Sequence, residues 1–241
     1  MNLKGKIAII TGASVGYGVG IAEVLKKEGC IVWITGRREN KLKKAAKRLN
    51  VKYFVGDVTK PKDWDELVKS VISSDKKIDI LINNAGAGIA VKPLENQTDE
   101  EIKQSIDTNL TGCIYGTKRV IPLMKKQGGG NIIFISSVCA QHAWPTFSVY
   151  SAAKAGTESL AKCLHNELRE DNIHITTLMP SWGDTEFAKA ADLKGFSADI
   201  KKKVAKPAEI GQLVVSICKF PEHLAMPFVR IQPMIQEINP M

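Results

Sequence analysis

Short runs of apolar, β-branched residues alternate along the chain with longer stretches whose apolar residues recur at helical spacing. Short apolar runs bounded by turn residues are typical of buried strands, whereas a period near 3.6 residues is typical of helices. The predicted strands cover residues 7–10, 31–35, 52–55, 78–82, 131–135, 174–178 and 228–232. The predicted helices cover residues 17–28, 39–49, 61–74, 99–126, 150–170 and 207–219.

This alternation predicts an α/β fold, in which a parallel sheet carries helices on both faces. We expect residues 1–241 to form a single domain, because folds of this class routinely run to 200–250 residues. Ligands of such sheets bind beyond the carboxyl ends of the strands. The segment 181–206 begins at that edge and has no clear periodicity, so we expect it to be a substrate lid.

The net charge is +9, and much of it lies in lysine-rich helical stretches. Neither aromatic interleaving nor a recognition module accompanies it, so we expect solvated helix faces and an anionic cofactor or substrate, not a nucleic-acid partner. No apolar run reaches the ~18–20 residues of a membrane span, and the first strand leaves no room for a signal peptide. Five scattered cysteines without a CxxC pair predict free thiols, no metal site and a cytoplasmic protein.

The first predicted strand runs into a glycine-rich turn, TGASVGYG at residues 11–18, and a helix follows at once. Glycine permits a sharp turn and close approach to a ligand, and a helix amino terminus attracts an anion. This context favours dinucleotide binding, which we assign to Gly12, Ser14, Gly16, Tyr17 and Gly18. The alternative is a hydrolase elbow, GxSxG, with Ser14 as nucleophile. It is disfavoured because the elbow borrows an N–H from an earlier strand–helix loop, and no strand precedes this one.

The second predicted strand ends in Gly36 followed by Arg37 and Arg38. A carboxylate at this place would favour NAD, whereas a guanidinium suits the 2′-phosphate of NADP. We therefore expect NADP(H), with Arg37 ranked ahead of Arg38 and NAD less favoured. Asp57, followed by Val58, comes after the third strand, where a carboxylate accepts from the adenine amino group or simply forms a turn.

Tyr150 and Lys154 lie four residues apart, so their side chains share one helical face. A cation about 4 Å from a phenol stabilises the phenolate by about 4 kcal/mol at an effective dielectric near 20, which is roughly three pKa units. Ser137 follows the fifth strand, where its hydroxyl can donate to a carbonyl oxygen. Taken alone, the Tyr150–Lys154 pair is as typical of a solvated helix face as of a catalytic site. The surrounding motifs therefore decide between these two interpretations.

Those motifs stand in order along the chain: TGxxxGxG at 11–18, NNAG at 83–86, NxxG at 109–112, Ser137 and YxxxK at 150–154. Together they resemble the short-chain dehydrogenase/reductase family, and the resemblance covers essentially the whole chain. It implies a Rossmann-type, doubly wound sheet of seven parallel strands in the order 3-2-1-4-5-6-7. It also implies homodimers or homotetramers that pack through the helices at 99–126 and 150–170.

The same resemblance implies four catalytic roles. Tyr150 would protonate the substrate carbonyl, and Lys154 would lower the pKa of the tyrosine and bind the nicotinamide ribose. Ser137 would polarise the carbonyl, and Asn109 would hold a water that links Lys154 to solvent. The remaining cofactor contacts it implies are Asn84, Ala85, Gly86, Pro180 and Thr185, together with Tyr150 itself.

Two positions depart from the family pattern. Val15 stands where many NADP-using members carry arginine or lysine, and Ser181-Trp182 follows Pro180 where glycine is common. Phosphate recognition would then rest on an arginine after the second strand with help from Ser14. Since serine lacks glycine's backbone freedom, the shape of the pocket near the expected nicotinamide also changes.

The substrate pocket is expected between 87–94, 138–148 and 181–206, which carry no clear carboxylate clamp. Its expected lining is Cys139, Gln141, His142, Trp144, Phe147, Trp182 and Phe187. The tail at 231–236 is similar to the I-x-P-x-x-Q tail of reductases for small carbonyls and 3-hydroxy acids. We therefore expect an NADP(H)-dependent oxidoreductase for such substrates. The alternatives are a 3-oxoacyl-[acyl-carrier-protein] reductase and an NADP-binding regulatory protein without turnover.

Overall fold

The strands form the sheet that the alternation predicts. The computed structural model describes residues 2–237, and within them seven strands pair in the order β3-β2-β1-β4-β5-β6-β7, each pair parallel. The Rossmann-type, doubly wound α/β fold is therefore confirmed. The strands are β1 (Ile7–Thr11), β2 (Ile31–Gly36), β3 (Lys52–Val55), β4 (Ile80–Asn83), β5 (Gly130–Ile135), β6 (Ile173–Pro180) and β7 (Phe228–Ile231).

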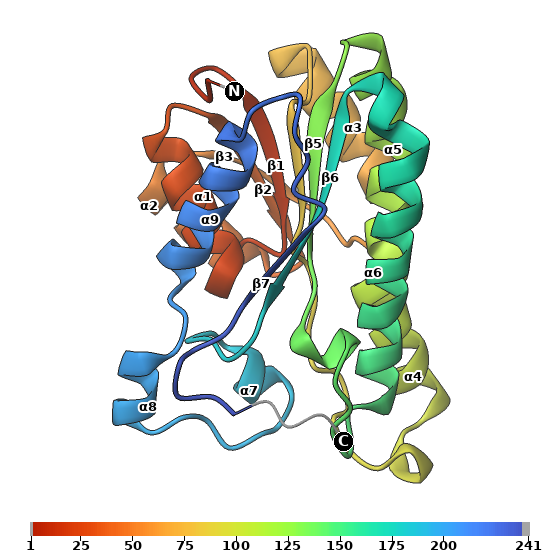
Figure 1. Ribbon diagram of the computed structural model, residues 1–241, viewed down its shortest axis with the longest axis vertical. Helices are drawn as coiled ribbons and strands as arrows, with labels where there is room; N and C mark the ends of the chain where they lie inside the picture. The colour runs from red at the N-terminus through yellow and green to blue at the C-terminus, as the bar shows by residue number, and fades with distance from the viewer. Residues whose placement is uncertain (1, 238–241) are drawn as a thin grey trace.

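Helices cover both faces of the sheet (Figure 1). One face carries α1 (Gly16–Lys27), α2 (Glu39–Leu49) and α9 (Pro207–Lys219). The other carries α3 (Pro61–Asp75), α5 (Gly112–Lys126) and α6 (Ser148–Leu168). The shorter helices are α4 (Asp99–Ile106), α7 (Phe187–Ala190) and α8 (Ala198–Lys203), with 3-10 turns at Leu94–Asn96, Val138–Ala140 and Arg169–Asp171.

Successive residues of β1 pack into different cores. Ala8 and Ile10 lie in the core beneath α1, α2 and α9, whereas Ile7 and Ile9 lie in the core beneath α3, α5 and α6. Because both faces are covered, the strand is buried throughout and its sequence shows no polar alternation. Each buried isoleucine contributes about 1.5–3 kcal/mol, so the two cores hold the sheet in place.

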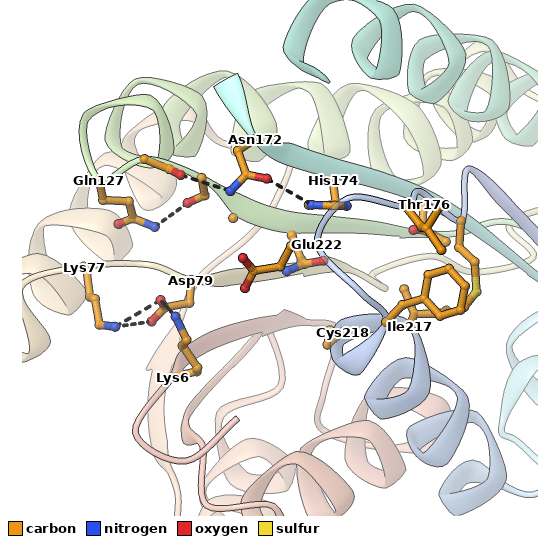
Figure 2. A pocket seen from close by; sticks show the side chains of 17 residues that line it. Lys6, Lys77, Asp79, Gln127, Asn172, His174, Thr176, Ile217, Cys218 and Glu222 are labelled. Atoms are coloured by element: carbon orange, nitrogen blue, oxygen red, sulfur yellow. Dashed lines mark hydrogen bonds and ion pairs between the residues drawn. The ribbon is translucent and has the colours of Figure 1, made fainter. Parts of the chain in front are cut away.

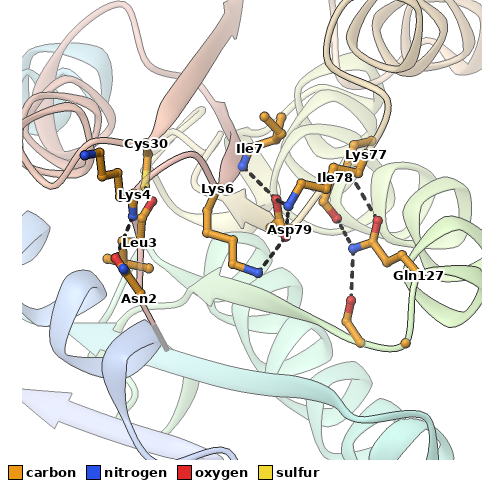
Figure 3. A network of polar contacts seen from close by, with 12 residues as sticks. Asn2, Leu3, Lys4, Lys6, Ile7, Cys30, Lys77, Ile78, Asp79 and Gln127 are labelled. Atoms are coloured by element: carbon orange, nitrogen blue, oxygen red, sulfur yellow. Dashed lines mark hydrogen bonds and ion pairs between the residues drawn. The ribbon is translucent and has the colours of Figure 1, made fainter.

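β4 begins at Ile80, two residues after its predicted start, because the buried Asp79 marks the edge of the sheet (Figure 3). Its carboxylate accepts hydrogen bonds from the Ile7 N–H at 2.8 Å and from the ammonium groups of Lys6 and Lys77 at 3.1 and 3.0 Å. A buried carboxylate requires such partners. The network ties the amino end of β4 to that of β1.

The predicted helix at 99–126 is divided into three parts. A π-helical turn, Asp107–Thr111, separates α4 from α5, and Asn109 lies at its centre. The buried Asn109 amide donates to the carbonyl oxygens of Ala87 and Ser105, both at 3.0 Å, and its side-chain oxygen accepts from the Ala87 N–H at 3.1 Å. The interruption at Asn109 joins the helix to the segment that follows β4.

Two glycines allow α1 and α9 to pack backbone against backbone. A Cβ atom at Gly20 would lie 2.2 Å from the carbonyl carbon of Pro207, and one at Gly211 would lie 2.7 Å from the Gly20 carbonyl oxygen. No larger residue fits at such distances. The helix that leaves the glycine loop is therefore packed tightly against the helix that follows the predicted lid.

The predicted lid, 181–206, leaves and re-enters the fold at one place. Gly183 and Ala205 form a parallel bridge. The Asp184 N–H donates to the Ala205 carbonyl at 2.9 Å, and the Ala205 N–H donates to that of Trp182 at 3.2 Å. The short helices α7 and α8 lie between these points, at the carboxyl edge of the sheet (Figure 1).

The remaining features limit the kinds of site that the fold contains. The five cysteines are free. Within residues 2–237, none of the helices combines the length and apolar character needed to cross a membrane. The His, Cys, Asp and Glu side chains of the same part of the chain form no group of three or more able to hold a metal ion.

Candidate active site

The carboxyl ends of the parallel strands bring most of the predicted site residues to one edge. The glycine loop follows β1, Asn84 to Gly86 follow β4, and Ser137 follows β5. Pro180 ends β6, and Thr185 comes shortly after it. Tyr150 and Lys154 reach the same edge from the first turns of α6. These side chains and loops therefore gather at the carboxyl edge of the sheet.

The glycine loop leaves space for a ligand at the amino end of α1. Gly12 and Gly16 have φ values of 62° and 60°, which favour glycine. A Cβ atom at Gly12 would lie 2.7 Å from the Ala85 Cα, and one at Gly16 would lie 3.4 Å from the Thr185 Cβ. No side chain caps the first turn of α1, so its N–H groups point at an anion site of the kind that holds a pyrophosphate. The cradle fits the predicted dinucleotide.

Asn84 fixes the loop from the neighbouring strand. Its side-chain amide donates to the carbonyl oxygens of Thr11 at 2.8 Å and Gly12 at 3.3 Å. The Thr11 hydroxyl accepts from the backbone N–H groups of Asn84 and Ala85 at 3.0 and 2.9 Å. The Asn84 side chain therefore bridges the ends of β1 and β4.

Tyr150 is buried at the floor of the site, in the first turn of α6. Burial raises its pKa well above the ordinary value of 10.0, while a hydrogen bond with Ser137 acts in the opposite direction. The Ser137 hydroxyl oxygen accepts from the Cys139 N–H at 3.2 Å, which leaves its proton available for donation. Phe147 and Phe187 contact the phenol ring, with centroids at 6.1 and 5.4 Å.

Lys154 is buried beside the phenol, with its Nζ 5.8 Å from the ring centroid. One of its three N–H donors goes to the Ile135 carbonyl at 2.9 Å. A Cβ atom at Gly86 would lie 3.1 Å from this Nζ and 2.8 Å from the Asn109 Oδ1. The structure thus brings Lys154, Gly86 and Asn109 together, and a water relay through Asn109 stays a prediction.

The expected lowering of the Tyr150 pKa by Lys154 is not produced by the protein's own groups. Burial lowers the pKa of Lys154 and raises that of Tyr150, because each loses its hydration in the same apolar pocket. The four-residue spacing indicates that the two groups are close, but it does not report this desolvation.

The two arginines after β2 point to different neighbours. Arg37 lies 3.9 Å from the Asp57 carboxylate. Arg38 donates to the Ser14 hydroxyl and to the Glu186 carboxylate, both at 3.3 Å. The Asp57 carboxylate accepts hydrogen bonds from the Thr59 N–H at 3.0 Å and from the Thr59 hydroxyl at 2.9 Å. Asp57 therefore forms a turn, which was the alternative to an adenine contact. The Val58 carbonyl oxygen accepts a hydrogen bond from the Trp64 indole N–H at 3.0 Å.

The partner of Ser14 bears on the hydrolase alternative. A nucleophilic serine needs a general base that can accept its proton. Arg38 is permanently protonated and cannot do so, so this contact suits an anion site and not a nucleophile.

The family model described as short chain dehydrogenase matches residues 6–194 of this sequence. The chain belongs to the short-chain dehydrogenase family. Oxidoreductase asL5 of Sarocladium schorii is 38% identical to it over 217 residues, which is 87% of each chain.

Solved structures agree with this membership. The closed form of serine dehydrogenase complexed with NADP+ is similar with a TM-score of 0.88 at 28% identity, covering 98% of both chains. The 3-ketoacyl-(acyl-carrier-protein) reductase from Brucella melitensis, complexed with NADH, is similar with a TM-score of 0.87 at 26% identity, covering 95% of this chain and 97% of that one.

Two site residues of this short-chain dehydrogenase were missed by sequence reasoning. Glu186, in the predicted lid, accepts from Lys41 at 3.0 Å as well as from Arg38. Lys41 follows Arg38 by three residues on α2, and this helical spacing was a usable signal. For Glu186 the sequence contained no comparable signal, because this residue lies in a segment without periodicity.

The departures after β6 are explained by the tail of this short-chain dehydrogenase. The Gln236 side-chain oxygen accepts from the Ser181 hydroxyl and, at 3.2 Å, from the Trp182 N–H. Trp182 then packs on Phe196, with ring centroids 5.2 Å apart. The tail glutamine thus fixes the segment that stands where the family pattern has glycine.

A cavity of about 290 Å³ lies at the opposite, amino edge of the sheet in this short-chain dehydrogenase (Figure 2). Its polar groups pair with one another, such as Asp79 with Lys6 and Lys77, and Asn172 with His174 at 3.3 Å. Its described lining includes none of the predicted catalytic or cofactor residues. The candidate active site is therefore the carboxyl edge.

Proposed function

We propose that this protein is an NADP(H)-dependent oxidoreductase that interconverts a ketone and a secondary alcohol. The observation that carries the proposal is the buried Tyr150 in hydrogen-bonding reach of Ser137 and beside Lys154, at the same sheet edge as the glycine loop and the uncapped start of α1. A general acid, a carbonyl-polarising hydroxyl and a dinucleotide cradle then share one edge. Membership of the short-chain dehydrogenase family supports the same reaction class.

The chain's own residues divide the work of carbonyl reduction. Reduced nicotinamide, when bound, supplies the hydride. Ser137 donates a hydrogen bond to the carbonyl oxygen and orients it. Tyr150 delivers the proton to that oxygen, and its raised pKa keeps it protonated in the neutral range. Lys154 uses its remaining donors on the ribose, and Asn109 positions the backbone beside it.

The 2′-phosphate contact is assigned to Arg38, with Ser14 and Lys41. Arg38 lies at the mouth of the glycine loop on Ser14, and Lys41 meets it on the Glu186 carboxylate. The Glu186 carboxylate lies between these two cations, in the way that a phosphate would. The serine dehydrogenase complex with NADP+ supports this preference, and Arg37 remains the alternative.

Replacing Arg38 by alanine is expected to weaken NADPH binding by about 10- to 100-fold, the loss of a charged hydrogen bond. NADH binding should change little, because NADH lacks the 2′-phosphate. Dissociation constants from NAD(P)H fluorescence titration test this, with Arg37→Ala as the matched control. A larger loss in the Arg37 variant would move the phosphate contact to Arg37.

The substrate class proposed is a small carbonyl or 3-hydroxy acid. Serine is itself a 3-hydroxy acid, so the likeness to serine dehydrogenase supports this class. Phe147 and Phe187 enclose the phenol and suit a compact substrate. The likeness to a 3-ketoacyl-(acyl-carrier-protein) reductase supports an acyl thioester as the second candidate.

A single assay separates these functions. Purified protein is given NADP(H) with serine, 3-hydroxybutyrate, small ketones or an acetoacetyl thioester, and NADPH absorbance is followed. Highest kcat/KM for 3-hydroxy acids or small ketones supports the proposal, whereas highest kcat/KM for the thioester favours the second candidate. NADPH binding without turnover in wild type and Tyr150→Phe alike would instead indicate a regulatory protein.

We also propose a cytoplasmic homodimer or homotetramer. The free thiols suit a reducing compartment. Large apolar side chains are exposed on the outer helices and the last strand, with Ile114 and Phe228 each 38% exposed. A monomer by light scattering at micromolar concentration would rule the assembly out.

A further inference from the structure

Glu186 joins the segment after β6 to helix α2, across the mouth of the glycine loop. Its carboxylate accepts hydrogen bonds from the Lys41 ammonium at 3.0 and 3.2 Å and from the Arg38 guanidinium at 3.3 Å. Arg38 also donates to the Ser14 hydroxyl of the loop at 3.3 Å. The two cations assigned to the 2′-phosphate are therefore already paired with a carboxylate of the protein itself.

This pairing lies at the surface, where a ligand can reach it. The side chains of Arg38, Lys41 and Glu186 are 51%, 46% and 45% exposed. Ser14 and Lys41 also line a cleft of about 590 Å³ beside the amino end of α1. Because exposed ion pairs contribute little to stability, an anion that enters this region can displace the carboxylate.

The backbone keeps Glu186 close to the cofactor cradle. The preceding residue, Thr185, packs on the glycine loop, where a Cβ atom at Gly16 would lie 3.4 Å from the Thr185 Cβ. The following residue, Phe187, packs on Tyr150, with ring centroids 5.4 Å apart. The Thr185 hydroxyl also accepts from the Phe187 N–H at 3.2 Å. Glu186 therefore stays near a dinucleotide in the cradle even when its carboxylate leaves the two cations.

A carboxylate and a phosphate compete for the same two cations. Both groups accept charge-assisted hydrogen bonds from a guanidinium and an ammonium, and two anions held at such distances repel each other. A 2′-phosphate on Arg38 and Lys41 therefore requires that Glu186 move away. A cofactor with a 2′-hydroxyl carries no charge at this position, so it leaves the ion pairs of Glu186 in place.

We propose that Glu186 is a specificity-determining residue that holds the place of the 2′-phosphate in the free protein. It lowers the affinity for NADP(H) and leaves the affinity for NAD(H) unchanged. The preference for NADP(H) is then smaller than Arg38 and Lys41 alone would produce. This inference rests on the proposed function, because it requires the 2′-phosphate of NADP(H) to bind at Arg38.

The test uses two ligands that differ only in the 2′-phosphate and the Glu186→Gln variant, which keeps the size of the side chain. Adenosine 2′,5′-bisphosphate is expected to bind Glu186→Gln about 3- to 10-fold more tightly than wild type, because two exposed ion pairs no longer compete with the phosphate. Adenosine 5′-monophosphate should bind both proteins equally within twofold. Calorimetric titration measures the four dissociation constants, and NADPH with NADH repeats the comparison on whole cofactors.

Two further variants locate the effect. Glu23 lines the same cleft, but its carboxylate pairs with Lys27 at 2.8 Å and with Arg48 at 3.9 Å. Glu23→Gln is therefore the matched control for the loss of one negative charge, and it should bind adenosine 2′,5′-bisphosphate within twofold of wild type. In the Arg38→Ala background, Glu186→Gln should give a smaller gain, because one of the two cations for which the anions compete is gone.

The outcomes separate this inference from the proposed function. Weaker binding of the bisphosphate by Glu186→Gln would mean that Glu186 supports the phosphate site, and this would overturn the inference. An equal gain for both ligands, or an equal gain in Glu23→Gln, would overturn it as a general effect of charge. An unchanged affinity in Glu186→Gln with a loss in Arg38→Ala would overturn the inference alone. Failure of wild type to bind NADPH would overturn the proposed function together with it.

Discussion

Tyr150→Phe is expected to lower kcat for ketone reduction by about 10³-fold, within the range found for general acids. The variant keeps the ring that packs between Phe147 and Phe187 and removes only the proton donor. NADPH affinity should therefore hold within about twofold, because the hydroxyl faces the substrate. Steady-state kinetics and fluorescence titration measure the two quantities on one preparation.

Two controls make this result interpretable. Tyr115→Phe, on α5, should leave kcat unchanged, since it removes a hydroxyl outside the site. Ser137→Ala should cost less than Tyr150→Phe, because it removes a polarising hydrogen bond and not the proton source. Retention of wild-type kcat by Tyr150→Phe would show that the tyrosine is not the proton donor.

Stability is expected to fall steeply as the pH rises above about 9. Burial raises the pKa of the Cys30 and Cys113 thiols to about 11 and that of Cys218 to about 12, from an ordinary value of 9.0. Above pH 9 the unfolded chain releases these protons while the native state retains them, so the free energy of unfolding decreases with pH. Each thiol contributes up to about 1.4 kcal/mol per pH unit until its folded pKa is reached.

Urea unfolding followed by circular dichroism between pH 7 and pH 10.5, under reducing conditions, measures this slope. A Cys30→Ala, Cys113→Ala, Cys218→Ala variant should start less stable, because buried volume is lost, and should show a shallower decline. The buried phenols of Tyr17 and Tyr150 continue the decline above pH 10 in both proteins. An equal slope in the triple variant would contradict the assignment to thiols.

The sheet and most of the site were predictable because topology carries local patterns to one edge. Each of the residues Gly12, Asn84 and Ser137 closely follows a strand, and parallel pairing brings those strand ends together without further information. The strand order itself came from the resemblance and not from the pattern. Boundaries moved where a buried polar side chain intervened, as at Asp79 and Asn109.

Pairings across the lid were not predictable. Arg38 and Glu186 are 148 residues apart, and their contact depends on the path of a segment without apolar periodicity. Tyr17 was assigned to the cofactor site, but its contact with Gly183 appears only when both backbones are placed. The direction of the Tyr150 pKa shift was not predictable for a related reason, since sequence spacing reports proximity and not desolvation.

The bridge between Gly183 and Ala205 has a consequence for how this protein diversifies. Because the ends of the intervening segment are already joined, its closure cost grows only with the logarithm of its length. On one side it meets β6, and on the other it meets α9, which packs on α1 through Gly20. The stretch between them can therefore change in length and in side chains while the strands and α1 keep their positions.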